Sequence, residues 1–76
     1  MAEPRLIREI AKEIRNDWKT INPAANEYLK ALEVSNYITD MYIYDTVSSC
    51  VLYFLSNAGT WRGDTARRIK KELKSL

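Results

Sequence analysis

Apolar residues separated by three and four positions are the feature that most constrains the fold of this chain. They recur in this way from Pro4 to Trp18, and charged residues fill the positions between them. Because an α-helix has 3.6 residues per turn, such residues fall on one helical face. The pattern therefore predicts an amphipathic helix that ends near Lys19. Its inner face comprises Leu6, Ile7, Ile10, Ala11, Ile14 and Trp18.

Two further segments show the same periodicity. Asn22 and Pro23 form a helix start signal, a capping side chain followed by proline at the first helical position, and predict a second helix that ends near Val34. Asp45 is a suitable N-cap for a third helix. The stripe of this third helix is broad, which predicts a central position. It comprises Val47, Cys50, Val51, Phe54, Leu55 and Ala58, and is widened by Leu52 and Tyr53.

A tight turn is predicted between the third helix and a fourth one. Gly59 suits the left-handed position after a helix, and Thr60 suits the N-cap of a helix that runs from Trp61 to about Lys74. Gly63 would lie in the first turn of this fourth helix. We interpret the glycine as a position where a large side chain passes close to the backbone. The predicted inward-facing residues are Trp61, Ala66, Ile69, Leu73 and Leu76.

The segment from Ser35 to Tyr44 has no clear periodicity. It is rich in β-forming residues but does not alternate apolar and polar positions. An isolated strand would leave its backbone hydrogen bonds unsatisfied, unless a dimer supplied a partner strand. We therefore interpret the segment as a turn with a short helical piece. The fold class that follows is all-α, a compact bundle of about four short helices in a single domain over residues 1–76.

The scarcity of cysteine and histidine excludes the usual supports of a small domain. The 76 residues contain one cysteine, Cys50, and no histidine, so an intramolecular disulfide and soft metal-ligand sets are excluded. The remaining sources of stability are core packing and self-association with a second copy. Cys50 lies on the apolar face of the third helix, where a thiol is expected to be inert. Trp18 and Trp61 are expected in the core.

The same composition argues against an enzyme. Catalysis requires a positioned nucleophile, a base and a pocket that excludes water, whereas the ten acidic residues here are scattered along polar helix faces. We expect no cofactor and no small-molecule substrate. The longest strongly apolar stretch, from Cys50 to Leu55, is far shorter than the roughly 20 residues that span a bilayer. Without an apolar leader either, we expect a cytoplasmic protein with no membrane partner.

Positive charge is concentrated at the C-terminal end. Residues 60–76 hold six basic and two acidic residues, a net charge of +4, whereas residues 1–59 hold six and eight, a net charge of −2. A basic helix of this kind is suited to nucleic-acid phosphates, although cations near a helix C-terminus also form ordinary solvated faces. The candidate nucleic-acid contacts are Arg62, Arg67, Arg68, Lys70, Lys71 and Lys74.

Tyrosines are concentrated in the middle segment, which contains Tyr37, Tyr42 and Tyr44. Tyrosine is enriched at protein–protein interfaces, which makes these three residues candidates for binding a protein partner. The alternative is that their rings cap the end of a small bundle while their hydroxyl groups reach water. Both interpretations fit the pattern.

About half of the chain resembles a group of small all-helical proteins from phages and integrated mobile elements of Gram-positive bacteria. The similar stretches are residues 10–14, 17–19, 23–25, 51–58 and 60–70, which include Asp17-Trp18-Lys19 and Trp61-Arg62-Gly63-Asp64. The middle differs, because a Tyr-Gly pair is expected ahead of the aspartate where this chain has Tyr42-Ile43-Tyr44-Asp45. The group has no assigned activity, so the resemblance implies a mobile-element origin but transfers no site residue. We predict an accessory protein that acts through protein contacts, or alternatively through nucleic acid.

Overall fold

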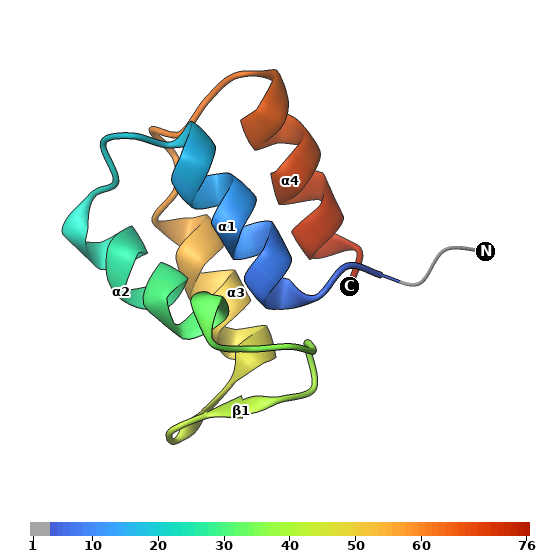
Figure 1. Cartoon of the computed structure of the whole chain (residues 1–76). Coiled ribbons are helices and arrows are strands. Elements are labelled where there is room, and N and C mark those ends of the chain that lie inside the picture. Colours follow the sequence, from blue (N-terminus) through green and yellow to red (C-terminus); the bar gives the residue numbers. More distant parts are fainter. Residues whose placement is uncertain (1–3) are drawn as a thin grey trace.

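Four helices and one small hairpin make up the domain. The computed structural model describes residues 4–76, and Figure 1 shows the arrangement of the elements. The helices are α1 (Ile7–Asp17), α2 (Pro23–Glu33), α3 (Val47–Ser56) and α4 (Asp64–Lys74). Between α2 and α3, strands β1 (Met41–Tyr42) and β2 (Asp45–Thr46) form a two-stranded antiparallel sheet. The prediction of an all-α bundle is confirmed.

Helices α1 and α2 begin and end close to the predicted positions. At the start of α2, the Asn22 side chain accepts a hydrogen bond from the Ala25 amide at 2.8 Å, as an N-cap should. The start of α1 is capped differently: the amides of Ile7 and Arg8 donate to carbonyl groups of residues 36 and 35, just after α2. These bonds satisfy amides that have no partner inside their own helix. They fix the start of α1 against the end of α2.

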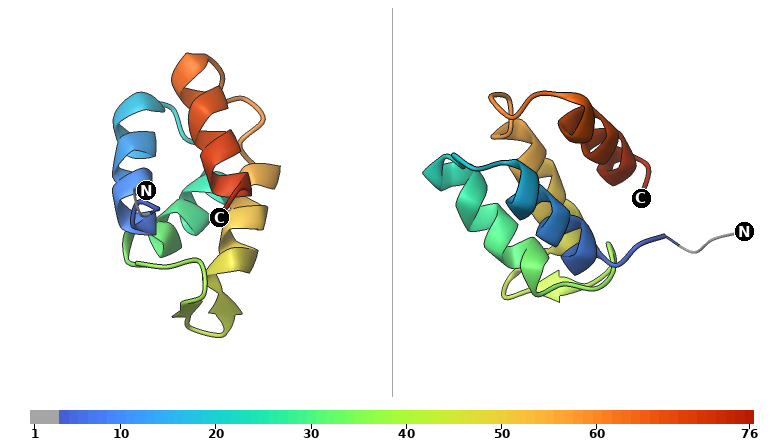
Figure 2. Two further views of the ribbon diagram at one scale, coloured as in Figure 1. Left: turned by 90° about the vertical axis from the view of Figure 1, so that its right-hand side faces the viewer. Right: turned by 45° about the horizontal axis from the view of Figure 1, so that its top comes forward.

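The core lies between the four helices, which pack in the pairs α1–α2, α2–α3 and α1–α4. The views in Figure 2 show α1 and α3 on opposite sides of the core, with α2 and α4 closing the other two. Phe54 of α3 is completely buried and meets the rings of Trp18 and Trp61 edge-on. The two tryptophan rings stack with their centroids 5.6 Å apart. The prediction that both tryptophans are buried is confirmed.

The middle segment forms a turn followed by a hairpin. The Asp40 amide donates to the Tyr37 carbonyl, so the predicted turn is present, but the predicted short helical piece is wrong. Met41 pairs with Thr46, and Tyr42 with Asp45, which leaves Ile43 and Tyr44 as a two-residue loop. Strand β1 therefore pairs with a strand that begins only three residues after β1 ends. This pairing could not be predicted from the sequence, because a strand of two residues is too short to show an alternation of apolar and polar positions.

Replacement of Ile43 by asparagine should stabilise the domain. Ile43 has a φ of 55°, which is a strained conformation for a β-branched residue and costs about 1–2 kcal/mol. Asparagine tolerates this conformation, and Ile43 is largely exposed, so little burial is lost. We expect a gain of about 1 kcal/mol in the free energy of unfolding, measured by urea denaturation. The same substitution at Tyr44, which has no positive φ, should bring no gain.

The start of α3 lies one residue later than predicted. Asp45 belongs to β2 and does not cap the helix; Thr46 is the N-cap, and its hydroxyl group accepts from the Ser49 amide at 3.0 Å. The hairpin pairing determines this, because it places Asp45 opposite Tyr42. The buried stripe of α3 is also narrower than predicted. Leu52 and Tyr53 are exposed instead of widening it.

The connection between α3 and α4 differs most from the prediction. It runs from the C-cap Asn57 to the N-cap Gly63, and Gly63 has a φ of 113° whereas Gly59 has no positive φ. Gly59 instead lies inside a turn in which the Trp61 amide donates to the Ala58 carbonyl. No atom lies within 4 Å of a Cβ built on Gly63, so our interpretation of a crossing side chain is wrong.

Trp61 therefore lies outside α4. Its ring is buried even so, and its indole nitrogen donates to an Asp17 carboxylate oxygen at 2.8 Å. The connection is thus anchored to the end of α1 by a buried side chain. The predicted tight turn capped by Thr60 is wrong, because burial of this tryptophan requires a longer loop before α4 begins.

Candidate binding surfaces

The six candidate cations at the C-terminal end do not form one free phosphate-binding face. Arg67 pairs with Asp64 in the first turn of α4, and Arg68 pairs with Glu13 of α1. Within residues 4–76, no ion pair involves the other four, which are Arg62, Lys70, Lys71 and Lys74. Two of the six charges are therefore already matched by carboxylates.

Ion pairs between Arg5, Glu13, Arg68 and Glu72 join the start of the described chain to α1 and α4. Arg5 lies 2.6 Å from a Glu72 oxygen and 2.9 Å from a Glu13 oxygen. Hydrogen bonds from Arg68 and then Arg5 hold the pKa of Glu13 below its usual range. Because all these side chains are partly exposed, the network contributes little stability. It does neutralise the α1-facing side of α4.

Lys70 is directed inward, so its predicted role as a phosphate contact is not supported by its position. Its ammonium group donates to the carbonyl oxygens of Ala58 at 2.8 Å and Trp61 at 2.7 Å. It also lies 5.8 Å from the centre of a Trp61 ring, within the range of a cation–π interaction. Burial and the nearby positive charges lower the pKa of Lys70. This lysine holds the loop between α3 and α4.

The predicted tyrosine surface is divided. Tyr37 and Tyr44 are exposed, with Tyr44 93% accessible, whereas Tyr42 is half-buried against the core. Met41 and Ile43 are exposed beside them. The hairpin extends beyond the helices at one end of the bundle (Figure 1). Packing against the end of the bundle therefore applies to Tyr42 alone. The other two tyrosines are exposed in a stretch of chain that we call the hairpin segment (residues 37–44).

Two adjoining cavities lie at the same end of the bundle. The larger, of about 570 Å³, lies between the start of the described chain, residues 36–39 and the end of the chain. The smaller, of about 170 Å³, lies between α3 and α4. Both are lined by Ile38 and Leu76, and the smaller one also by Leu52, Leu55 and Lys74. We call the two cavities together the groove. The groove was not predicted, because Leu52, Leu55 and Leu76 were assigned to the core.

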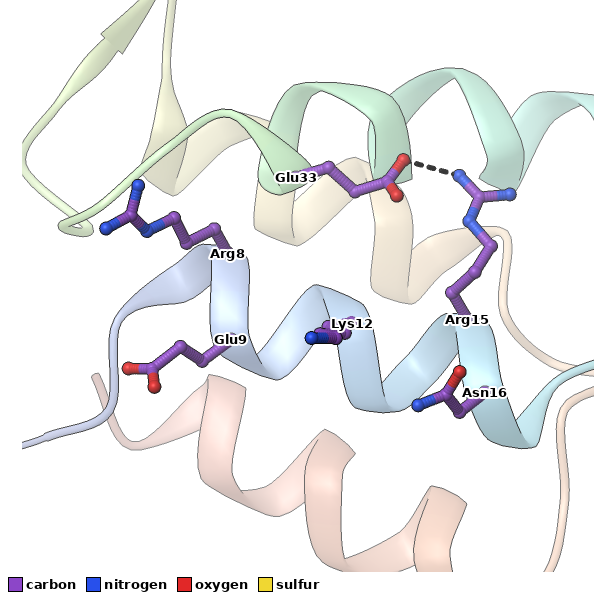
Figure 3. A pocket seen from close by; sticks show the side chains of 6 residues that line it. All are labelled: Arg8, Glu9, Lys12, Arg15, Asn16 and Glu33. Carbon is purple, nitrogen blue, oxygen red and sulfur yellow. Dashed lines mark hydrogen bonds and ion pairs between the residues drawn. The ribbon is translucent and has the colours of Figure 1, made fainter.

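A third cavity, of about 410 Å³, lies on the outer side of α1 (Figure 3). It is lined by charged and polar side chains of both signs, namely Arg8, Glu9, Lys12, Arg15, Asn16 and Glu33. Arg15 bonds to Glu33 at 2.6 Å and to Asn26 at 2.7 Å, which links α1 to α2. These contacts are typical of two neighbouring helices whose polar side faces solvent.

The chain between residues 4 and 76 offers no cluster of three or more side chains that could hold a metal ion. No helix in that part is long and apolar enough to cross a membrane.

Cys50 should react with thiol reagents only after unfolding. Its side chain is buried on the inner face of α3, and burial, with a smaller effect of the Asp45 charge, raises the pKa of the thiol. Both effects reduce the reactive thiolate. We expect labelling by a chromogenic disulfide reagent to be about 100-fold slower in buffer than in urea. Equal rates in the two solvents would show that the thiol is accessible in the folded protein.

Fold and surface together define a small four-helix domain with an exposed hairpin and an apolar groove at one end. Comparisons with protein-family models, with curated proteins and with solved structures found no match to this chain. A function for this chain is therefore inferred from its own residues.

Proposed function

We propose that this chain is a small helical binding protein that contacts a protein partner, or a second copy of itself, through the hairpin segment. The observation that carries this proposal is the gathering of exposed apolar side chains there. Tyr37, Met41, Ile43 and Tyr44 are all more than half exposed. Soluble domains of this size rarely leave a continuous apolar surface uncovered unless it meets another molecule.

The local geometry supports the same conclusion. Tyr44 and Ile43 form the hairpin loop, where both side chains are exposed and Ile43 has a positive φ. Strain of this kind is concentrated at functional sites, where it is retained because it positions a group. Tyrosine supplies a large, rigid contact surface with a polar tip, which suits the centre of a protein interface.

The biological setting that we propose is the cytoplasm of a bacterium, as an accessory protein of a mobile element. The sequence resemblance supports this setting. We propose binding without catalysis. Nucleic-acid binding is the second candidate, and it is favoured by the cations Arg62, Lys71 and Lys74, which have no ion-pair partner within the described part of the chain.

Photocrosslinking from Tyr44 tests the proposed function. A photoreactive phenylalanine replaces Tyr44 in one variant and Lys12, on the outer side of α1, in a matched control. In bacterial cells that produce the protein, we expect discrete crosslinked products from position 44 that are lost when Met41 becomes aspartate. Identical products from both positions would contradict the proposal. Sedimentation of the purified chain at several concentrations then distinguishes a second copy from another protein.

A further inference from the structure

We propose that the groove beside the hairpin segment binds an acidic amphipathic helix of a partner protein. This inference rests on the proposed function, since Tyr37 and Ile38 form one wall of the groove. It goes further than the proposed function, because it specifies the chemical nature of the partner. Two features of the groove indicate such a partner, its apolar floor and the positive charge of its α4 rim.

The two cavities share two apolar lining residues. Ile38 and Leu76 line both cavities and are partly buried against the core, so the cavities adjoin at an apolar strip. The buried residue Ile7 also lines the larger cavity, and Leu52 lines the smaller one. Leu52 is 63% exposed. A strip of this kind fits the apolar face of a helix, whose anchoring side chains recur every three or four residues.

The rim on α4 is positively charged with helical spacing. Lys74 lines the smaller cavity and Lys71 lies one turn earlier along the same helix, and neither has an ion-pair partner within residues 4–76. Each of these residues is exposed. Carboxylates at the same spacing on a bound helix would meet these cations, which would fix its orientation and speed its association. A nucleic acid would use the cations but would leave the apolar floor uncovered.

A designed peptide provides the probe. It has about 16 residues, with leucines along one helical face and glutamates at the remaining positions, and carries a fluorescent label. One control peptide has the same composition with the leucines distributed around the helix, and a second has lysine in place of glutamate. Fluorescence anisotropy at low salt measures their binding to the whole chain. We expect the acidic amphipathic peptide to bind at least about tenfold more tightly than either control.

Two variants of the protein locate the binding site. Leu52→Asp, at an exposed position, should weaken binding of the acidic peptide at least about tenfold, because it places a carboxylate in the apolar floor. Lys74→Glu should weaken binding about fivefold, whereas Lys12→Glu makes the same charge change on the outer side of α1 and should leave it unchanged. Circular dichroism confirms that each variant is folded.

Several results would overturn the inference. They are no binding of the acidic peptide at low salt, equal binding of the scrambled peptide, and equal effects of Lys74→Glu and Lys12→Glu. Displacement of the peptide by duplex DNA, with Leu52→Asp binding normally, would assign the basic rim to phosphates instead. If the groove variants have no effect while crosslinking from Tyr44 persists, the groove inference is wrong and the proposed function stands.

Discussion

Phe54→Ala is expected to unfold this domain. Phe54 is completely buried and contacts both tryptophan rings, so its removal leaves a cavity in the centre of the core. Such a substitution costs about 3–5 kcal/mol, which equals roughly the whole stability that a core of this size supplies. A thermal melt followed by circular dichroism should show a midpoint lowered by about 15–40 °C, or no folded baseline at all.

Leu52→Ala is the matched control for this experiment. Leu52 belongs to the same helix but is mostly exposed, so its truncation should change the free energy of unfolding by less than about 0.5 kcal/mol. Similar losses of stability in the two variants would contradict the arrangement of α3 described above.

Gly63→Ala should have the second largest effect. Gly63 has a φ of 113° and a ψ of 179°, a backbone region that is essentially restricted to glycine and costs other residues about 1–3 kcal/mol. There is open space around a Cβ at this position, so the cost comes from the backbone alone. We expect the urea midpoint to fall correspondingly, with an unchanged slope.

Gly59→Ala separates this strain from a general effect of removing glycine. Gly59 also has open space around a Cβ but no positive φ. Alanine there should be neutral or slightly stabilising, because it reduces the conformational entropy of the unfolded chain. Equal destabilisation at both glycines would show that the start of α4 is not as described.

The parts of the fold that could be predicted are those encoded by local signals. The start of α2 follows from Asn22 and Pro23, which act on their own neighbours, and the apolar periodicity of α1 identifies the buried residues Ile10 and Ile14. The burial of Trp18 followed in the same way. Each of these features depends on a few adjacent residues and on a preference that packing reinforces.

Features that depend on distant residues could not be predicted. Both Gly59 and Gly63 could take a positive φ near the start of α4, and the sequence does not show that Trp61 packs against the end of α1, so that α4 begins only after Gly63. Periodicity likewise placed Leu52 in the core, although it is largely exposed and lines the smaller cavity of the groove. Lys70 is a comparable case, since its carbonyl acceptors lie in a loop whose shape the sequence does not reveal.

The candidate sites were predicted less completely than the fold. Tyr37 and Tyr44 are exposed and stay predicted protein contacts, whereas Tyr42 packs inward. The basic end was recognised as a concentration of charge, but counting charges does not show which ones carboxylates neutralise. Arg68 illustrates the difference, because its partner Glu13 is 55 residues away in the chain.

Titration with labelled duplex DNA at increasing salt most directly tests the central claim, that binding depends on apolar contacts at the hairpin end and not on phosphate contacts of the basic helix. We expect that any binding of DNA at low salt is weak, disappears near physiological salt and is unchanged by Tyr44→Ser. Tight binding that persists at that salt concentration, and that is abolished by Arg62→Glu with Lys71→Glu in a folded variant, would contradict this claim and establish nucleic acid as the partner.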